Sequence, residues 1–504
     1  MTQPPRQGHD HGPGRRQRLL ILGICSMSLL IVGLDSTIVN IALPSIHRSF
    51  HSSFSGLQWT IDAYTLVIAS LLMVSGSTAD RVGRRRVFQI GLTVFSLGSL
   101  LCALAPSLGA LIAARILQAI GGSMLNPVAM SIIRNVFEDP RERAQAIGAW
   151  GGVIGISMAL GPVLGGVLVD SVSWRAVFLV NLPVGVAAII LTALFVPESR
   201  AAHPRRIDPV GQALVIVALA SLTYAIIEGP KAGWTSVQTL GLGAVSVLAF
   251  AGLVAWELRH PEPLIEIRFF RSAPFSGASA IAVSVFAALG GFLFLNTLYL
   301  QDVRGLSPLD AGLYTLPMAA MMLVVGPISG HIVGRRGSRL PLVGGSIFLI
   351  ASGLILTQLT ATTPLWLLVI AYLLFGIGFG LVNPPITNTA VSGMPPSQAG
   401  VAAAVASTSR QVGQTLGVAV LGALAAGGVA AAAGPGFAAA THISWWIIVG
   451  LGFLVLALAL VSTTPWARRT AEQTAELLRE PERPTISEPA PAAVGEDRRQ
   501  AVPS

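Results

Sequence analysis

The sequence GSTADRVGRRR, residues 76–86, places one aspartate, four arginines and two glycines between long apolar segments. A related segment, GHIVGRRGSR, stands at residues 330–339. When the two segments are aligned on their first glycine, they share Arg81 and Gly83, whereas Asp80 is replaced by glycine in the second copy. The chain therefore repeats one charged loop within an apolar sequence, which indicates that it consists of two related halves.

The overall composition excludes an ordinary soluble protein. Of the 504 residues, 53% are hydrophobic and only 11% are charged, whereas about a quarter of the residues are charged in soluble domains. Apolar stretches long enough to cross a bilayer, which takes roughly 20 residues, recur from residue 19 to residue 465. They lack the alternating pattern of a membrane-spanning barrel, so we predict an all-α integral membrane protein.

We predict fourteen transmembrane helices, and the pair between residues 207 and 257 interrupts the internal repeat. The expected organisation is an N-terminal cytoplasmic tail, a six-helix half, an inserted two-helix segment, a second six-helix half and a disordered cytoplasmic tail. These parts span residues 1–18, 19–198, 199–272, 273–465 and 466–504. The predicted helices lie near residues 19–43, 57–78, 87–105, 108–131, 144–169, 175–196, 207–228, 238–257, 275–299, 309–331, 340–359, 364–389, 401–426 and 441–464.

The arginines predict the orientation of the chain. They gather in both tails and in every second loop, whereas the opposite loops hold only Arg48, Arg175, Lys231 and Arg304. The positive-inside rule then places both termini in the cytoplasm. Because the net charge of +9 is distributed loop by loop, it does not indicate a nucleic-acid surface. We expect a monomer that crosses the bacterial cytoplasmic membrane many times.

Five segments in sequence order carry a family resemblance. They are LDSTIVNIALPSI (34–46), GSTADRVGRRR (76–86), RILQAIGG (115–122), SMALGPVLGG (157–166) and WRAVFLVNLP (174–183). With them the sequence is similar to the major facilitator superfamily, and within it to the fourteen-helix drug:proton antiporters. Thr78 stands where leucine is usual in the charged loop, and Ser157 replaces the first glycine of the fifth-helix motif. The resemblance implies two six-helix halves plus two inserted helices, and export of small hydrophobic or cationic compounds by alternating access. It also implies that the proton motive force drives transport without a cofactor.

Ionisable residues inside the predicted helices are costly to bury and therefore informative. Asp35 is the first candidate for a carboxyl group that takes up and releases a proton, and a structural hydrogen bond is the alternative. Asp62 is the second candidate, unless it is solvated near the external end. Arg115 cannot readily lose its proton and would tune a neighbouring carboxylate. Arg410 either lines a cavity or extends to the cytoplasmic interface.

The charged loop is predicted to act as a cytoplasmic gate. An aspartate there can pair with a guanidinium group or with the N-terminus of a neighbouring helix, and such a contact can break when the conformation changes. The alternative is that the arginines only set the topology. The predicted gate residues are Gly76, Asp80, Arg81, Gly83, Arg84 and Arg85.

Glycines spaced four residues apart characterise the fifth predicted helix. They allow a neighbouring helix to approach closely, and the proline among them permits a bend. The family resemblance implies that this helix seals the protein against proton leak, whereas packing alone is the alternative. The residues concerned are Gly155, Gly161, Pro162, Gly165 and Gly166.

The remaining polar residues within the predicted helices are candidates for a substrate cavity, although several of them would form ordinary helix-to-helix hydrogen bonds. The sequence has no cluster with metal-ligand spacing and no GxxxxGK[ST] loop, so we expect neither a metal site nor an enzyme. A facilitator or importer of a metabolite, or a membrane sensor without flux, remains the alternative to an exporter. The cavity candidates are Asn40, Trp59, Tyr64, Gln118, Asn126, Asn181, Asn296, Tyr299, Asn383 and Arg410.

Overall fold

The computed structural model describes residues 14–201, 207–395, 398–429 and 436–478. Regular structure in these ranges is entirely helical. The elements are α1 (Arg15–Phe50), α2 (Phe54–Val82), α3 (Arg84–Leu104), α4 (Leu108–Val136), α5 (Pro140–Ser171), α6 (Ala176–Leu179), α7 (Asn181–Phe195), α8 (Pro209–Ala232), α9 (Val237–Glu257), η1 (Ile267–Arg271), α10 (Ala273–Leu298), η2 (Tyr299–Val303), α11 (Pro308–Arg336), α12 (Arg339–Leu356), α13 (Leu365–Val391), α14 (Ala399–Val429), α15 (Gly436–Ala440), α16 (His442–Ser462) and α17 (Pro465–Leu478).

The helices have the length and composition that a bilayer requires. Thirteen helical stretches within the described ranges are long and apolar enough to cross a membrane. Helix α14 has 31 residues and packs along α10, so it supplies a fourteenth membrane-length helix. The structure thus confirms the predicted all-α membrane fold.

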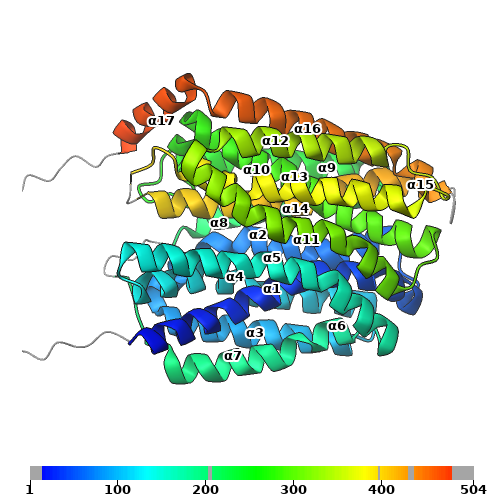
Figure 1. The fold of residues 1–504 in the computed structure, drawn as a ribbon, viewed down its shortest axis with the longest axis horizontal. Coiled ribbons are helices and arrows are strands. Elements are labelled where there is room, and N and C mark those ends of the chain that lie inside the picture. Colours follow the sequence, from blue (N-terminus) through cyan, green and yellow to red (C-terminus); the bar gives the residue numbers. More distant parts are fainter. Residues whose placement is uncertain (1–13, 202–206, 396–397, 430–435, 479–504) are drawn as a thin grey trace, which may run out of the picture.

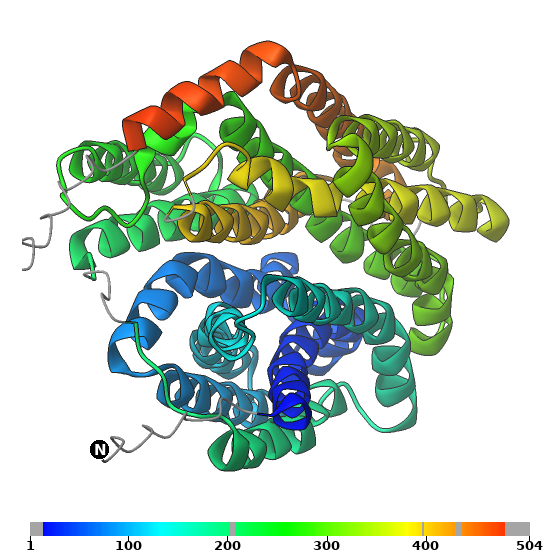
Figure 2. The same cartoon turned by 60° about the vertical axis from the view of Figure 1, so that its left-hand side comes forward.

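Two bundles lie side by side, one built from α1–α7 and the other from α10–α16 (Figures 1 and 2). The second helix of each bundle packs against the fifth helix of the other, so that α2 contacts α14 and α11 contacts α5. The aligned glycines of the repeated loop, Gly83 and Gly337, directly follow α2 and α11, and both have positive φ angles, 128° and 77°. Glycine adopts this backbone without a steric cost, which explains its presence in both copies.

The inserted helices α8 and α9 pack against each other, and α8 also contacts both α2 and α14. Its hydrogen bonds run to α2: Gln212 Nε2 donates to the Ser70 carbonyl at 2.7 Å, and Glu228 Oε1 accepts from Trp59 Nε1 at 3.1 Å. The Trp59 ring also lies 5.7 Å from the ring of Tyr224 on α8. Helix α8 is therefore attached to the first half and lies over the line where α2 meets α14.

The prediction of a disordered tail is wrong for residues 466–478, which belong to α17 and lie across one end of the second half (Figure 1). Thr470 Oγ1 accepts a hydrogen bond from the Ala273 amide at the start of α10, at 3.0 Å. Small side chains at helical spacing allow the close packing that composition alone did not reveal. Residues 479–504 lie outside the described residues. The buried positions of α17 are Ala467, Ala471, Thr474 and Leu478.

The polar contacts between the halves lie mainly toward the end remote from α17 and from the start of α1, which share one end of the bundle (Figure 1). At the remote end the Leu309 amide donates to Asp170 Oδ2 at 3.1 Å. Gln301 Nε2 donates to the Ile41 carbonyl at 2.9 Å. Nearby, Gln58 Nε2 donates to the carbonyls of Val418 and Ala419, both at 3.0 Å. We call this remote end the closed end.

The close approach of α5 and α11 at the closed end predicts the effect of adding a side chain. A Cβ at Gly312 would lie 2.3 Å from the Pro162 carbonyl oxygen, so Gly312→Val should lower the melting temperature of the purified protein. Overpacking of this kind costs about 1–3 kcal/mol. Gly330→Val, on the same helix, is the matched control because a Cβ there meets no atom within 4 Å. Equal melting temperatures for the two variants, measured in detergent, would contradict the close contact.

Candidate functional site

A buried ion pair joins α1 to α4. Arg115 Nη1 lies 2.5 Å from Asp35 Oδ2, and the two side chains are only 1% and 0% exposed. The Arg115 guanidinium also donates from Nε to the Thr60 carbonyl at 3.2 Å and lies 4.0 Å from the centre of the Tyr64 ring. Both charges are thus balanced and bonded, which buried charges in a membrane protein require.

Two amides complete the surroundings of the Asp35 carboxylate. Gln118 Nε2 donates to Asp35 Oδ1 at 2.9 Å, and Asn181 Nδ2 donates to the same atom at 3.2 Å. Ser99 Oγ accepts from both amides, at 3.3 and 3.1 Å, and donates to the Phe178 carbonyl. Helices α1, α2, α3, α4 and α7 therefore contribute to one cluster, in which α4 and α7 bond directly to the carboxylate of α1.

The structure joins several residues that the sequence named separately. Asp35, Arg115, Gln118, Asn181 and Tyr64 form one cluster, although three of them were predicted only as cavity residues. Sequence reasoning missed two members, Ser99 and the Thr60 carbonyl. A serine or a backbone carbonyl in a predicted helix has no distinctive signal, because its role depends on which helix lies opposite.

A second carboxyl group, Asp62, is fully buried on α2. Its Oδ1 lies 3.5 Å from Thr65 Oγ1, and its Oδ2 has no hydrogen-bond partner in the described part of the chain. The alternative of a solvated Asp62 is therefore wrong. Thr65 in turn accepts from Thr415 Oγ1 of α14 at 2.9 Å, so Asp62 lies one helical turn from a hydrogen bond between the two halves.

The loop at residues 76–86 makes its contacts within the first half. Asp80 Oδ1 accepts from Arg84 Nε at 3.0 Å and from Arg84 Nη2 at 2.9 Å. The Glu198 carboxylate, which sequence reasoning missed, accepts from the amides of Arg85 and Arg86 and so caps the start of α3. A Cβ at Gly83 would lie 2.7 Å from Glu198 Oε1.

The remaining predicted gate residues contribute little to this arrangement. Arg81 is exposed, and a Cβ at Gly76 would make only an ordinary contact, 3.7 Å from Pro127. Asp80 pairs inside its own loop, so the expected contact with a neighbouring helix across the gap is not formed in this conformation.

The glycines of α5 fall into two groups. A Cβ at Gly161 would lie 1.9 Å from Thr37 Oγ1 of α1, and one at Gly166 would lie 2.6 Å from Leu309 Cα of α11. Pro162 lies within the helix between these contacts. Gly165 faces α1 and Gly155 faces α11, so the predicted residues bring α5 close to both halves.

The glycines nearer the start of α5 make no such contacts, although Gly148 with Gly152 and Gly151 with Gly155 have the same four-residue spacing. A Cβ at Gly148, Gly151 or Gly152 would have no described atom within 4 Å. The spacing alone predicted a close helix contact here, but in this conformation α5 has no close neighbour on that side. The contact between the halves thus loosens toward the end that holds the termini.

The structure does not gather the other cavity candidates into one site. Tyr372 donates to Asn296, and Tyr299 donates to the Thr360 carbonyl, so both candidates are bonded within the second half. Asn40 bonds to carbonyls of its own helix. Trp59 faces α8, as described above. Asn126 and Asn383 are half-buried.

Arg410 lies well inside α14 and does not extend to the interface. Its Nη2 donates to Thr387 Oγ1 of α13 at 2.5 Å, and its guanidinium lies 5.9 Å from the centre of the Phe286 ring of α10. The alternative of an interfacial arginine is therefore wrong. Its side chain remains half-buried among helices of the second half.

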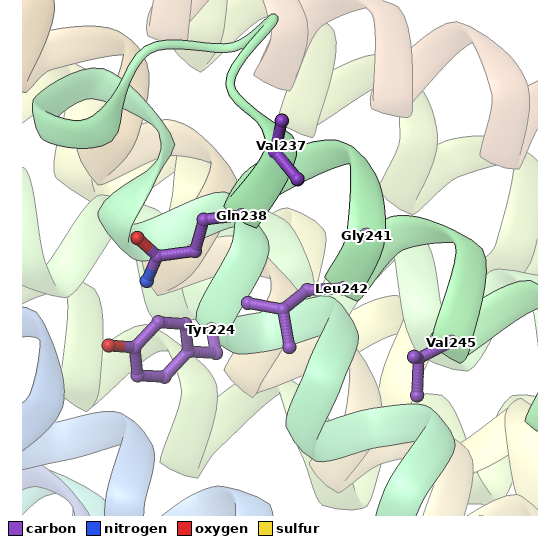
Figure 3. A pocket seen from close by; sticks show the side chains of 6 residues that line it. All are labelled: Tyr224, Val237, Gln238, Gly241, Leu242 and Val245. Carbon is purple, nitrogen blue, oxygen red and sulfur yellow. The ribbon is translucent and has the colours of Figure 1, made fainter.

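A hollow lies outside the Asp35 cluster. It is a shallow space of about 510 Å³ between α8 and α9, and its lining is mostly apolar (Figure 3). It lacks the converging polar groups that fix a ligand, so we do not assign the functional site to it. No group of metal-ligating side chains occurs in the described ranges. The hollow is lined by Tyr224, Val237, Gln238, Gly241, Leu242 and Val245.

Known proteins are similar to this chain in sequence and in fold. The chain is 39% identical over 420 residues to the multidrug resistance protein Stp of Mycobacterium tuberculosis, covering 83% of this chain and 78% of that protein. It is 37% identical over 429 residues to the tetracenomycin C resistance and export protein of Streptomyces glaucescens, covering 84% and 79%. A solved bacterial homolog of the human lysosomal transporter Spinster matches its fold with a TM-score of 0.63 at 18% identity, covering 92% of this chain and 99% of that one. Residues 25–418 match the family model of the Major Facilitator Superfamily. This chain is a member of the Major Facilitator Superfamily.

Proposed function

We propose that the protein is a secondary transporter that exports small hydrophobic or cationic compounds in exchange for protons. Relatives named for multidrug resistance and for export of an antibiotic support the export of drugs. The fully buried Asp35–Arg115 pair is the observation that carries the proposal. An enzymatic activity has no support in the site, and we propose that the protein acts as a monomer in the cell membrane.

Proton coupling follows from the chemistry of the pair. The guanidinium group of Arg115 keeps its proton, so the carboxylate of Asp35 is the partner that can change charge. A proton on Asp35 would remove the ion pair and weaken the bonds from Gln118 and Asn181. Because five helices meet at this carboxylate, the loss of these bonds would allow α1 and α4 to shift.

Asp62 is the second proposed proton site. A charged carboxylate there would leave Oδ2 without a donor, so a proton on this group removes a cost. Its bonded neighbour Thr65 contacts Thr415 of the other half. A change of charge at Asp62 would therefore act close to a contact that must move during transport.

Alternating access follows from the distribution of contacts between the halves. The halves meet at the closed end and separate toward the termini. If the positive-inside rule holds, the termini and the open end face the cytoplasm, ready to admit a compound for export. The loop at residues 76–86 would then form its gate contact in the opposite conformation, when the cytoplasmic end closes.

The proposed coupling predicts the effect of removing the charge at position 35. In liposomes, Asp35→Asn should slow the transport of ethidium that a pH gradient drives, by a factor of at least about ten. The reason is that the variant breaks a buried ion pair, which costs more free energy than the 1.4 kcal/mol that corresponds to a tenfold change. Exchange of ethidium without a gradient should persist, because it needs no proton. The double variant, Asp35→Asn with Arg115→Gln, removes both charges of the pair. It is the control for misfolding caused by an unpaired buried charge in the single variant.

Two results would contradict this coupling. Gradient-driven transport that survives Asp35→Asn would move the proton site to Asp62. Uptake that follows the membrane potential inward, in place of exchange with protons, would favour the facilitator or importer alternative. A protein that moves no compound in either direction would favour a sensor.

The hydrogen bond from the Leu309 amide to Asp170 caps the start of α11 and joins the two halves. Removing it should shift the equilibrium away from the conformation in which the closed end is closed. Asp170→Ala removes the acceptor of the Leu309 amide and should weaken the closed end by about 0.5–2 kcal/mol, the usual contribution of a helix N-cap. Spin labels at Val172→Cys and Leu313→Cys, both exposed in the wild type, should then report longer distances. Asp310→Ala is the matched control, since its carboxylate bonds to Ser307 within the same half. Identical distance distributions in the two variants would argue against the cap.

A further inference from the structure

The positive charge of Arg410 has no counter-ion among the residues that the structure describes. Its only polar contact is the neutral Thr387 hydroxyl, and its Nε is buried without a hydrogen-bond partner in the described ranges. Within the same ranges no carboxylate lies within ion-pair distance of the guanidinium. An unpaired charge inside a membrane protein is costly and marks a functional position.

The acids of the first half do not supply the missing charge. Asp35 already forms an ion pair with Arg115, and the carboxylate of Asp62 has only the side-chain hydrogen bond from Thr65 in the described residues. A second guanidinium, that of Arg134 on α4, also has no ion pair in the described part of the chain. It reaches toward the start of α14, where a Cβ at Gly400 would lie 3.3 Å from Arg134 Nη1. Two guanidinium groups, that of Arg410 on α14 and that of Arg134 facing the start of α14, therefore lack an ion pair in the described residues.

Arg410 is placed where a compound entering between the halves would meet it. The first hydrogen bond along α14 to α2 lies at Thr415, which donates to Thr65, and the next are those from Gln58. Arg410 precedes that contact, on the side of the termini, and is partly exposed there. Beside it lies the half-buried ring of Phe286, which packs against the buried ring of Phe379 at 5.2 Å.

We propose that Arg410 binds an acidic group of the exported compound, such as a carboxylate, a sulfonate or an ionised phenol. A guanidinium with free donors suits such a group, and neighbouring aromatic rings suit a flat apolar body. The inference rests on the proposed function, and it narrows the hydrophobic cargo to amphipathic organic acids.

The test compares two dyes that share a xanthene skeleton and differ in charge, the anion fluorescein and the cation rhodamine 123. Fluorescence anisotropy with the purified full-length protein in detergent should show that Arg410→Gln weakens fluorescein binding about tenfold or more. Rhodamine 123 should bind the variant at least as well as the wild type. Arg410→Lys keeps the charge and should restore part of the fluorescein affinity. Arg339→Gln, at an exposed arginine, is the control and should change neither dye.

Three outcomes would overturn the inference. Fluorescein binding that Arg410→Gln leaves intact would show that the guanidinium does not contact the acid. An equal loss of both dyes would show that Arg410 only supports the fold. Fluorescein binding that phosphatidylglycerol displaces, with no transport of fluorescein in liposomes, would assign Arg410 to a lipid headgroup.

Transport in liposomes separates this inference from the proposed function. If the wild type moves neither dye under a pH gradient, the proposed export fails and the assignment of Arg410 fails with it. If the wild type exports rhodamine 123 but Arg410→Gln leaves fluorescein binding unchanged, only the assignment of Arg410 fails.

Discussion

The cost of burying charge in a bilayer is the constraint on which the first half depends. Asp35 and Arg115 lie where neither side chain reaches water, so each needs the other. The amides of Gln118 and Asn181 satisfy the rest of the carboxylate, and their positions fix how α4 and α7 rotate relative to α1. Tight helix packing and the proposed chemistry therefore share the same atoms, so a change in the charge of Asp35 cannot remain local.

The contacts between the halves explain how a local change could spread. The pseudo-symmetric pairs, α2 with α14 and α5 with α11, are tight at the closed end and loosen toward the termini. Backbone approaches such as that of Gly312 to Pro162 act as pivots because they allow little sliding. The polar contacts beside them, such as Asp170 with the Leu309 amide, can be broken and reformed at modest cost.

The sequence predicted the membrane helices and the two halves well, because apolar length and a repeated loop are local signals. It also named Asp35 and Arg115, because charges stand out in apolar segments. It could not predict that Gln118 and Asn181 donate hydrogen bonds to Asp35, whereas Asn296 accepts one from Tyr372. All three are amides within apolar segments, and they differ only in the helix that lies opposite. Helix α17 was missed because the tail as a whole has a polar, proline-containing composition, although its buried residues Ala467, Ala471, Thr474 and Leu478 recur at helical spacing.

The place of α8 makes the two sides of the molecule unequal. It lies over the α2–α14 seam and is tied to α2 through Glu228 and Gln212, whereas no described helix takes the equivalent place over the α5–α11 seam. When the halves rock, the inserted hairpin would travel with the first half and slide along α14. Lipid-dissolved compounds would then find one flank shielded throughout the cycle, and lateral entry from the bilayer would be confined to the flank where the glycines of α5 face α11.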